Sequence, residues 1–123
     1  MRCEELRNLT VNELVGRFAA IAVEQDNAEL LDDNAKFTRL YWEMDAITSE
    51  LKSRADDQRR ALVTLFEHPN MQVRLTAAKA TLAVAPQAAR QLLQAITSSR
   101  CYPQAGDAGM CLVALDRGIF VPK

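Results

Sequence analysis

The stretch DQRRALVTLFEHPNMQVRLTAAKATLAVA, from Asp57 to Ala85, decides the fold that the sequence predicts. Each half carries apolar residues at helical spacing, and Pro69 separates the halves because proline disfavours helical backbone at the preceding residue. The second half has two apolar sides, one with Val73, Ala77, Ala80 and Val84 and the other with Leu75, Ala78 and Leu82. Such a helix is covered on both sides, and its small alanines let neighbouring backbones approach closely. The stretch predicts an antiparallel helix pair, 57–67 with 70–85.

Two further helix pairs are expected on either side of this central pair. Thr10-Val11-Asn12-Glu13 has the form of a capping box, which satisfies backbone N–H groups at a helix start. Pro86 suits the first position of a later helix, since its missing N–H would be unpaired there anyway. Gly106-Asp107 predicts a turn and cap before the last helix, which Gly118 ends. The expected pairs are 11–26 with 34–55, 57–67 with 70–85, and 87–98 with 107–117.

Length and composition favour one soluble all-α domain over residues 1–123. Apolar residues make up 49% of the chain and charged residues 25%, which is ordinary for a globular protein. The net charge is −1, but residues 1–51 hold five Lys/Arg against eleven Asp/Glu, and residues 52–123 hold ten against five. This asymmetry either orients a partner or a second copy of the chain, or reflects solvated helix faces.

Cysteine and histidine usage predicts neither a disulfide framework nor a metal site, and no cofactor is expected. The three cysteines form no C-x-x-C pair and lie far from His68 in sequence: Cys3, Cys101 and Cys111. Glu4 and Glu5 stand where a signal peptide would carry its apolar segment. The longest apolar run, Phe18 to Val23, is far too short to cross a membrane. We therefore expect a cytoplasmic protein.

Part of the central pair resembles the HEAT-repeat pattern P-x-x-x-V-R-x-x-A-A-x-A. The matching residues are Pro69, Val73, Arg74, Ala77, Ala78 and Ala80, whereas Thr81 stands where the pattern has leucine. This resemblance implies an α-α superhelix of about three antiparallel hairpins, of the HEAT or armadillo type. Three further segments resemble a family of small bacterial proteins with a domain of unknown function: Leu9–Val11, Asp57–Arg60 and Gly106–Met110. This family has no catalytic residue that could be carried over to the chain.

Trp42 lies off the apolar stripe of the long helix 34–55. It shares a second, less polar side of this helix with Ala35, Ala46 and Ser49. Two interpretations follow. Trp42 packs under the terminal segment Ile119–Val121 or against the first helix, because large aromatic residues are mostly buried. Alternatively, it anchors a partner, because tryptophan is enriched among the residues that dominate binding interfaces.

The charged residues of the central pair also allow two interpretations. Asp56 and Asp57 precede its first helix and Arg74 lies on its second, so one aspartate is positioned to hold Arg74 by a bidentate ion pair. A weaker hypothesis is a helical enzyme that uses Asp57 and Arg74. His68 lies at a helix end, where a cation meets the helix dipole favourably, so we interpret it as a cap rather than a catalytic base.

A group of basic residues around the central pair favours a nucleic-acid groove. Its members are Lys52, Arg54, Arg59, Arg60, Arg74 and Lys79. Lysine and arginine bind nucleic acid by neutralising phosphates. The group contains no interleaved aromatic residue, and Arg59 and Arg60 cannot both point the same way on one helix. The acidic pI of 5.8 also argues against a dedicated nucleic-acid binder.

The leading hypothesis is a non-catalytic protein–protein interaction module built on a short HEAT-like superhelix. Its candidate partner-binding residues are Trp42, Arg59, Arg60 and Arg74, and no catalytic, cofactor-binding or metal-binding residue is assigned. Nucleic-acid binding through the basic central pair is the alternative. The sequence does not identify the protein partner. Self-association is compatible with either hypothesis, because a short stack of hairpins leaves two end faces without the caps of longer solenoids.

Overall fold

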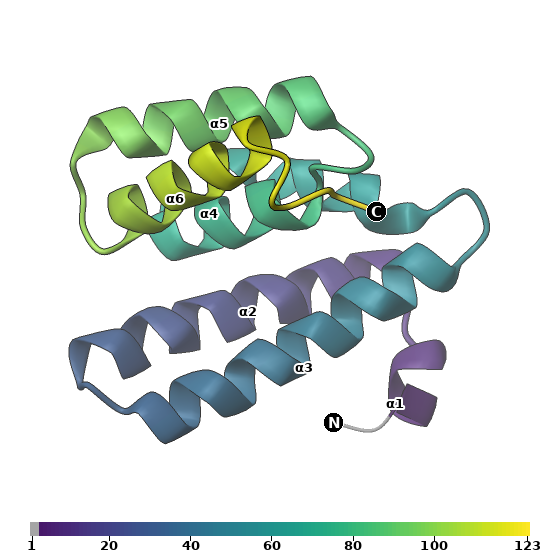
Figure 1. Cartoon of the computed structure of the whole chain (residues 1–123). Helices are drawn as coiled ribbons and strands as arrows, with labels where there is room; N and C mark the ends of the chain where they lie inside the picture. Colours follow the sequence, from purple (N-terminus) through teal and green to yellow (C-terminus); the bar gives the residue numbers. More distant parts are fainter. Residues whose placement is uncertain (1–2) are drawn as a thin grey trace. The chain divides into compact units, whose positions relative to one another are not determined.

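The computed structural model describes the backbone of residues 3–123 and the side chains of residues 5–123. The described chain consists of helices and their connections, without a strand between residues 3 and 123 (Figure 1). This confirms the predicted all-α class. The chain divides into two compact units, Met1–Ala61 and Leu62–Lys123, whereas the sequence predicted one domain. Asp56 and Asp57 both have positive φ, 64° and 48°, so the backbone changes direction just before this division.

The first unit contains α1 (Cys3–Arg7), α2 (Val11–Leu30) and α3 (Asn34–Ser53), with α2 and α3 antiparallel (Figure 1). The predicted capping box is present at the start of α2. Thr10 Oγ1 accepts from the Glu13 N–H at 3.1 Å, and Glu13 Oε1 accepts from the Thr10 N–H at 3.0 Å. The helix runs to Leu30 rather than Asp26, because neither proline nor glycine interrupts it before the turn.

The core of the first unit follows the helical period of the sequence. The buried side chains come from all three helices: Leu6 from α1, Leu14, Phe18, Ile21, Ala22 and Ala28 from α2, and Leu40, Met44, Ile47 and Leu51 from α3. Helix α1 was not predicted, because its five residues are too few to show a helical period. Tyr41, which follows the buried Leu40, is exposed.

The segment expected as an α-helix over residues 57–67 is the 3₁₀-helix η1 (Gln58–Glu67), which spans the division between the units. A 3₁₀-helix has three residues per turn, so side chains three positions apart lie above one another. Arg59, Leu62 and Leu65 have this spacing, and all three are buried. The spacing of buried residues in this segment therefore fits 3.0 residues per turn rather than 3.6.

The second unit contains α4 (Met71–Ala80), α5 (Pro86–Ser99) and α6 (Gln104–Asp116), and α4 packs on both other helices. Residues from these three helices, with Leu82 from the turn after α4, form its core: Leu75, Ala78, Leu82, Ala89, Leu93, Ile96, Ala108 and Cys111. Val73 and Ala77, on the other side of α4, are buried too. The prediction that this helix is covered on both sides is confirmed.

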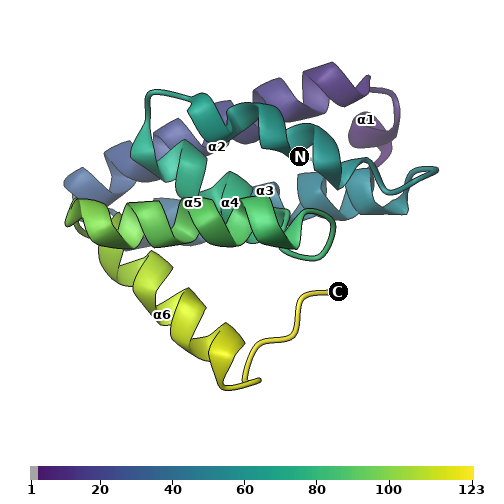
Figure 2. The same cartoon turned by 90° about the horizontal axis from the view of Figure 1, so that it is seen from above.

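The last helix starts earlier than expected. Gly106 and Asp107 lie inside its first turn, and its N-cap is Pro103. Pro103 has φ −82°, close to helical backbone, so the helix continues directly from it. Pro86 at the start of α5 and the positive φ of Gly118 after α6, 69°, are as predicted. Figure 2 shows that α6 runs at an angle to α5 and that the C-terminal tail continues from its far end.

None of the described helices combines the length and the apolar composition that crossing a membrane requires.

Candidate functional site

Trp42 lies on the exposed side of α3, with 62% of its surface accessible. It stands two residues from both Leu40 and Met44, about 200° around the helix and therefore opposite the buried stripe. Its ring meets that of Tyr41 edge to face, with centroids 5.1 Å apart and an interplanar angle of 84°. Because most of its surface is open to solvent, Trp42 is not buried against α2.

The side of α3 that carries Trp42 also carries three small residues, next to the exposed charged residues Arg39 and Asp45. Ala35 and Ser49 are exposed, and Ala46 is partly buried. Small residues at these positions let a partner helix approach closely. This aromatic surface, formed by Tyr41 and Trp42 with Ala35, Ala46 and Ser49, is the first candidate binding surface.

Arg59 and Arg60 point to different environments, as predicted. Arg59 is 8% exposed and holds the Asp57 carboxylate with two hydrogen bonds, from Nε at 2.9 Å and from Nη2 at 2.6 Å. The Asp57 carboxylate also accepts from the Arg59 N–H at 3.3 Å. Arg60 is exposed. The prediction of Arg59 as a partner-binding residue is corrected, because its guanidinium is buried and paired within its own loop.

Arg74 is engaged at the start of α4 rather than with Asp57. Its Nη1 donates to the His68 carbonyl at 3.1 Å, and its Nη2 to Met71 Sδ at 3.4 Å. His68 Nδ1 accepts from the Asn70 N–H at 3.0 Å. The expected ion pair between Asp57 and Arg74 is replaced by these local contacts, since Arg59 is only two residues from Asp57. Arg74 therefore braces the turn between η1 and α4.

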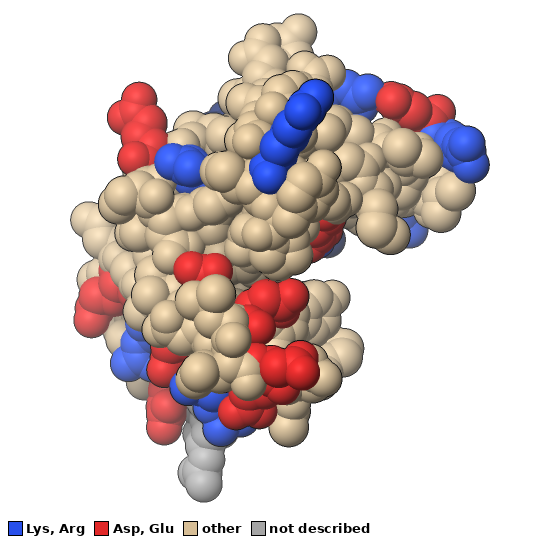
Figure 3. Space-filling model, turned by 90° about the vertical axis from the view of Figure 1, so that its left-hand side faces the viewer, with Lys and Arg blue, Asp and Glu red and all other residues tan. Residues whose placement is uncertain are grey.

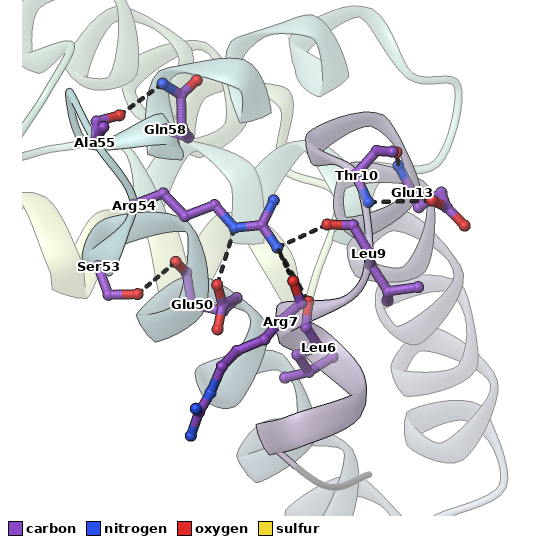
Figure 4. Close-up of polar contacts among 10 residues, drawn as sticks. All are labelled: Leu6, Arg7, Leu9, Thr10, Glu13, Glu50, Ser53, Arg54, Ala55 and Gln58. Carbon is purple, nitrogen blue, oxygen red and sulfur yellow. Dashed lines mark hydrogen bonds and ion pairs between the residues drawn. The ribbon is translucent and has the colours of Figure 1, made fainter.

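Arg54 joins α1 to the end of α3 (Figure 4). Its Nε donates to Glu50 Oε2 at 2.9 Å, and its Nη2 donates to the carbonyls of Leu6 at 3.0 Å and Leu9 at 2.7 Å. The last carbonyls of a helix lack intrahelical partners, and a cation near them is favourable. Arg54 thus caps the C-terminal end of α1.

Most of the basic group proposed for nucleic acid is used in internal contacts. Arg54, Arg59 and Arg74 are engaged as described, and Lys79 Nζ pairs with Asp107 at 3.0 Å. Lys52, Arg60 and Lys79 are the exposed members of the group. Carboxylates are the more visible charges on the first unit, where Figure 3 shows them gathered around the connection of α2 and α3. Arg54, Arg59 and Arg74 are therefore held by groups of their own chain.

An apolar groove on α6 is a second candidate surface that sequence reasoning missed. It has a volume of about 630 Å³. Small residues line it together with exposed large ones: Ala105, Gly106, Gly109 and Ala114, with Tyr102, Met110, Val113 and Ile119. The available signal was in α6, which carries Met110 and Val113 outside the stripe of Cys111, Leu112 and Leu115. A helix with apolar residues beyond its core stripe leaves part of them exposed.

Comparison with known proteins places the chain in a family. A family model described as a domain of unknown function (DUF2019) matches residues 12–116. The chain belongs to the DUF2019 family. The match runs from α2 to the end of α6, so both units are covered. The predicted membership in a family with a domain of unknown function is confirmed.

A solved structure extends this comparison. The DUF2019 chain is similar to the crystal structure of the protein RPA1889 from Rhodopseudomonas palustris, with 58% sequence identity and a TM-score of 0.94. The similarity covers 96% of this chain and 98% of that chain. A search of curated proteins finds no match.

The described part of the DUF2019 chain offers few groups for covalent chemistry. Burial raises the pKa of the Cys111 thiol, which disfavours the reactive thiolate. Cys101 is exposed, and the side chain of Cys3 lies outside the described residues. Between residues 5 and 123, no group of three or more His, Cys, Asp or Glu side chains is arranged to hold a metal ion.

Asp57 gives the DUF2019 chain a predicted pH dependence. Hydrogen bonds from the Arg59 side chain lower the pKa of this carboxyl in the folded state. The pair therefore adds stability that is complete above the unfolded pKa of about 3.9 and is lost as pH falls through the lower folded pKa. At neutral pH, we expect the unfolding free energy of the wild type to be larger than that of Asp57→Asn. This difference should become smaller in acid. Urea unfolding of both proteins across a pH series measures it, and a difference that persists in acid contradicts the assignment.

Proposed function

We propose that this chain is a non-catalytic protein-binding module, built on a short HEAT-like superhelix, that contacts its partner through the aromatic surface of α3. The observation that carries the proposal is the exposed pair of Trp42 and Tyr41 opposite the buried stripe of the helix. Contiguous exposed apolar groups mark interaction sites, and tryptophan and tyrosine are enriched among the residues that dominate binding energy.

The supporting scaffold suits this use. The antiparallel pair of α2 and α3 holds Trp42 on a helix of 20 residues whose other side is packed into a core. A residue on a packed helix loses little freedom when a partner binds, which lowers the entropic cost of association. The alanine-rich α4, covered on both sides, supports the HEAT-like part of the proposal, since small residues keep stacked helices close.

The contacts of the charged residues favour this function over the alternatives. A nucleic-acid surface needs cations that are available to phosphates, whereas Arg54, Arg59 and Arg74 are engaged with their own chain. An enzyme that uses Asp57 and Arg74 needs both at one site, and they have separate local partners. These observations support protein binding without catalysis.

Replacing Trp42 with alanine tests the proposal. Because the ring is mostly exposed, we expect Trp42→Ala to change the unfolding free energy by less than about 1 kcal/mol, against about 3–5 kcal/mol for a buried aromatic residue. Partner affinity should fall by at least about 30-fold, the loss expected for a central interface tryptophan. Circular dichroism during urea unfolding measures stability. Affinity capture from the native cell followed by mass spectrometry, and then titration of the captured protein, measures binding.

Phe120→Ala is the matched control, because it removes an aromatic ring from the C-terminal tail instead of α3. It should retain the host protein that Trp42→Ala loses. Loss of this protein with both variants, or with neither, contradicts a contact centred on Trp42. A second check uses the fact that Trp42 is the single tryptophan of the chain. Its fluorescence should be quenched readily by acrylamide in the free protein and become protected when the captured partner is added.

A further inference from the structure

Two arginines lie close in sequence to residues that line the α6 groove, Arg100 before Tyr102 and Arg117 before Ile119. Arg100 lies at the end of α5, and Arg117 follows the last residue of α6. Both are exposed, and neither has an ion-pair partner among the described side chains. The two acidic residues of α6 are already paired, Asp107 with Lys79 and Asp116 with Arg90. The apolar groove thus lies on a helix that has one exposed arginine four residues before its start and another directly after its end.

The connection between α2 and α3 presents the opposite combination. Residues 24–33 contain five acidic residues and no Lys or Arg. Two large apolar side chains in this segment are exposed to solvent: Leu30 is 78% exposed and Leu31 is 80% exposed. We call residues 24–33 the acidic leucine tip. Figure 3 shows its surroundings as a region rich in carboxylates.

The tip is held in shape by its own contacts. Asp33 Oδ1 accepts from the Lys36 N–H at 3.1 Å and caps α3, and the Asp33 N–H donates to the Ala28 carbonyl at 2.8 Å. The Leu31 N–H donates to the Asn27 carbonyl at 3.1 Å. These bonds fix the backbone on both sides of the two leucines. The leucines are therefore presented on an ordered turn, which reduces the entropy lost on docking.

We propose that the acidic leucine tip of one copy of this chain docks into the α6 groove of another copy. Leu30 and Leu31 enter the apolar groove between Tyr102 and Met110, over the small residues Gly106 and Gly109. The carboxylates of the tip then face Arg100 and Arg117. Opposite charges around an apolar contact orient the two surfaces and speed their encounter. This inference uses neither Trp42 nor the function proposed above.

A second copy is the occupant that the observations favour, because the chain carries both complementary surfaces. The tip belongs to the first unit, which has nine Lys/Arg and thirteen Asp/Glu, and the groove to the second, which has six and three. Each copy offers one tip and one groove, so the contact joins different surfaces of two copies. Such a contact produces a closed ring or pair where the rotation closes, and a chain of copies where it does not.

Two charge-reversal variants test the contact. The groove variant combines Arg100→Glu with Arg117→Glu, and the tip variant combines Glu24→Lys with Glu29→Lys, both at exposed positions of α2. Light scattering after gel filtration, over a micromolar to millimolar concentration series, should show the wild type above the monomer mass. Each variant alone should associate at least about 10-fold more weakly, because like charges then face each other. Their circular dichroism and unfolding midpoints should match those of the wild type.

Mixing the two variants distinguishes this contact from any other. In the mixture, the acidic tip of the groove variant can bind the unchanged basic groove of the tip variant. The reversed, basic tip of the tip variant can likewise bind the reversed, acidic groove of the groove variant. Association should therefore return toward the wild-type level, and added salt should weaken it. A wild type that stays monomeric throughout the series overturns the proposal. So does a mixture that associates no better than its components, because the groove then has a different occupant.

Discussion

Arg54→Ala is expected to lower the free energy of unfolding by about 3 kcal/mol, because hydrogen bonds to a charged group contribute about 1.5–3 kcal/mol and Arg54 makes several. The guanidinium links Glu50 of α3 to the carbonyls of Leu6 and Leu9 (Figure 4). Without it, the last carbonyls of α1 lose their cap. The helix has only five residues and is too short to persist alone in water. Urea unfolding followed by circular dichroism measures the loss.

Two further variants separate geometry from charge. Arg54→Lys keeps the positive charge, but a lysine ammonium lacks the planar fork of donors that lets Arg54 reach the Glu50 carboxylate and both carbonyls at once. Its unfolding free energy should therefore fall by nearly as much as that of Arg54→Ala. Lys52→Ala removes an exposed cation two residues away and should change stability by less than about 0.5 kcal/mol. Hydrogen exchange should become faster in residues 3–9 of Arg54→Ala. Unchanged exchange there, or equal losses from Lys52→Ala and Arg54→Ala, argues against the cap.

Arg59→Met is expected to cost about 2 kcal/mol. It keeps the length of the buried stem but removes both hydrogen bonds to Asp57. Breaking a fully buried pair costs about 3–5 kcal/mol, and the cost here is lower because the Asp57 side chain is 32% exposed and is partly rehydrated. The carboxylate of Asp57 would remain beside a backbone with positive φ and without its main partner. Urea unfolding at neutral pH gives the value.

Arg60→Met supplies the neighbouring control for this prediction. It removes the same charge one position along the chain, where the side chain is exposed, and should change stability by about 0.5 kcal/mol or less. The contrast between the two arginines is the result to look for. If Arg60→Met is as destabilising as Arg59→Met, the cost comes from the loss of charge in this region rather than from the pair with Asp57.

Local signals in the sequence located several helix boundaries. The capping box at Thr10 and Glu13 starts α2, Pro86 starts α5, and Gly118 follows α6 with positive φ. These signals are reliable because each acts on backbone groups within four residues. Helix α1 gave no such signal, because its stabilising partner Arg54 lies 45 residues or more away in the sequence. The 3₁₀ geometry of η1 was missed because Ala61, Leu62, Leu65 and Phe66 also fit an α-helical stripe.

The candidate site was less accessible to sequence reasoning. Trp42 was placed correctly off the buried stripe of its helix, because the direction of a side chain follows from the helical period. The sequence did not decide whether Trp42 is exposed, because its exposure depends on whether another segment of the chain covers it. The arginines show the same limit. Composition counts their charges but does not show that Arg59, Arg54 and Arg74 are each held by groups of their own chain.

The sequence by itself determined that this protein is all-α and where most of its helices start, because caps, prolines and the helical period act over a few residues. The tertiary structure decided which apolar and charged groups remain available at the surface. Burial and pairing depend on neighbours that the chain brings together from distant positions, as Arg54 meets Leu6 and Lys79 meets Asp107. Trp42, the α6 groove and the acidic leucine tip are candidates for binding because the packed helices leave them uncovered.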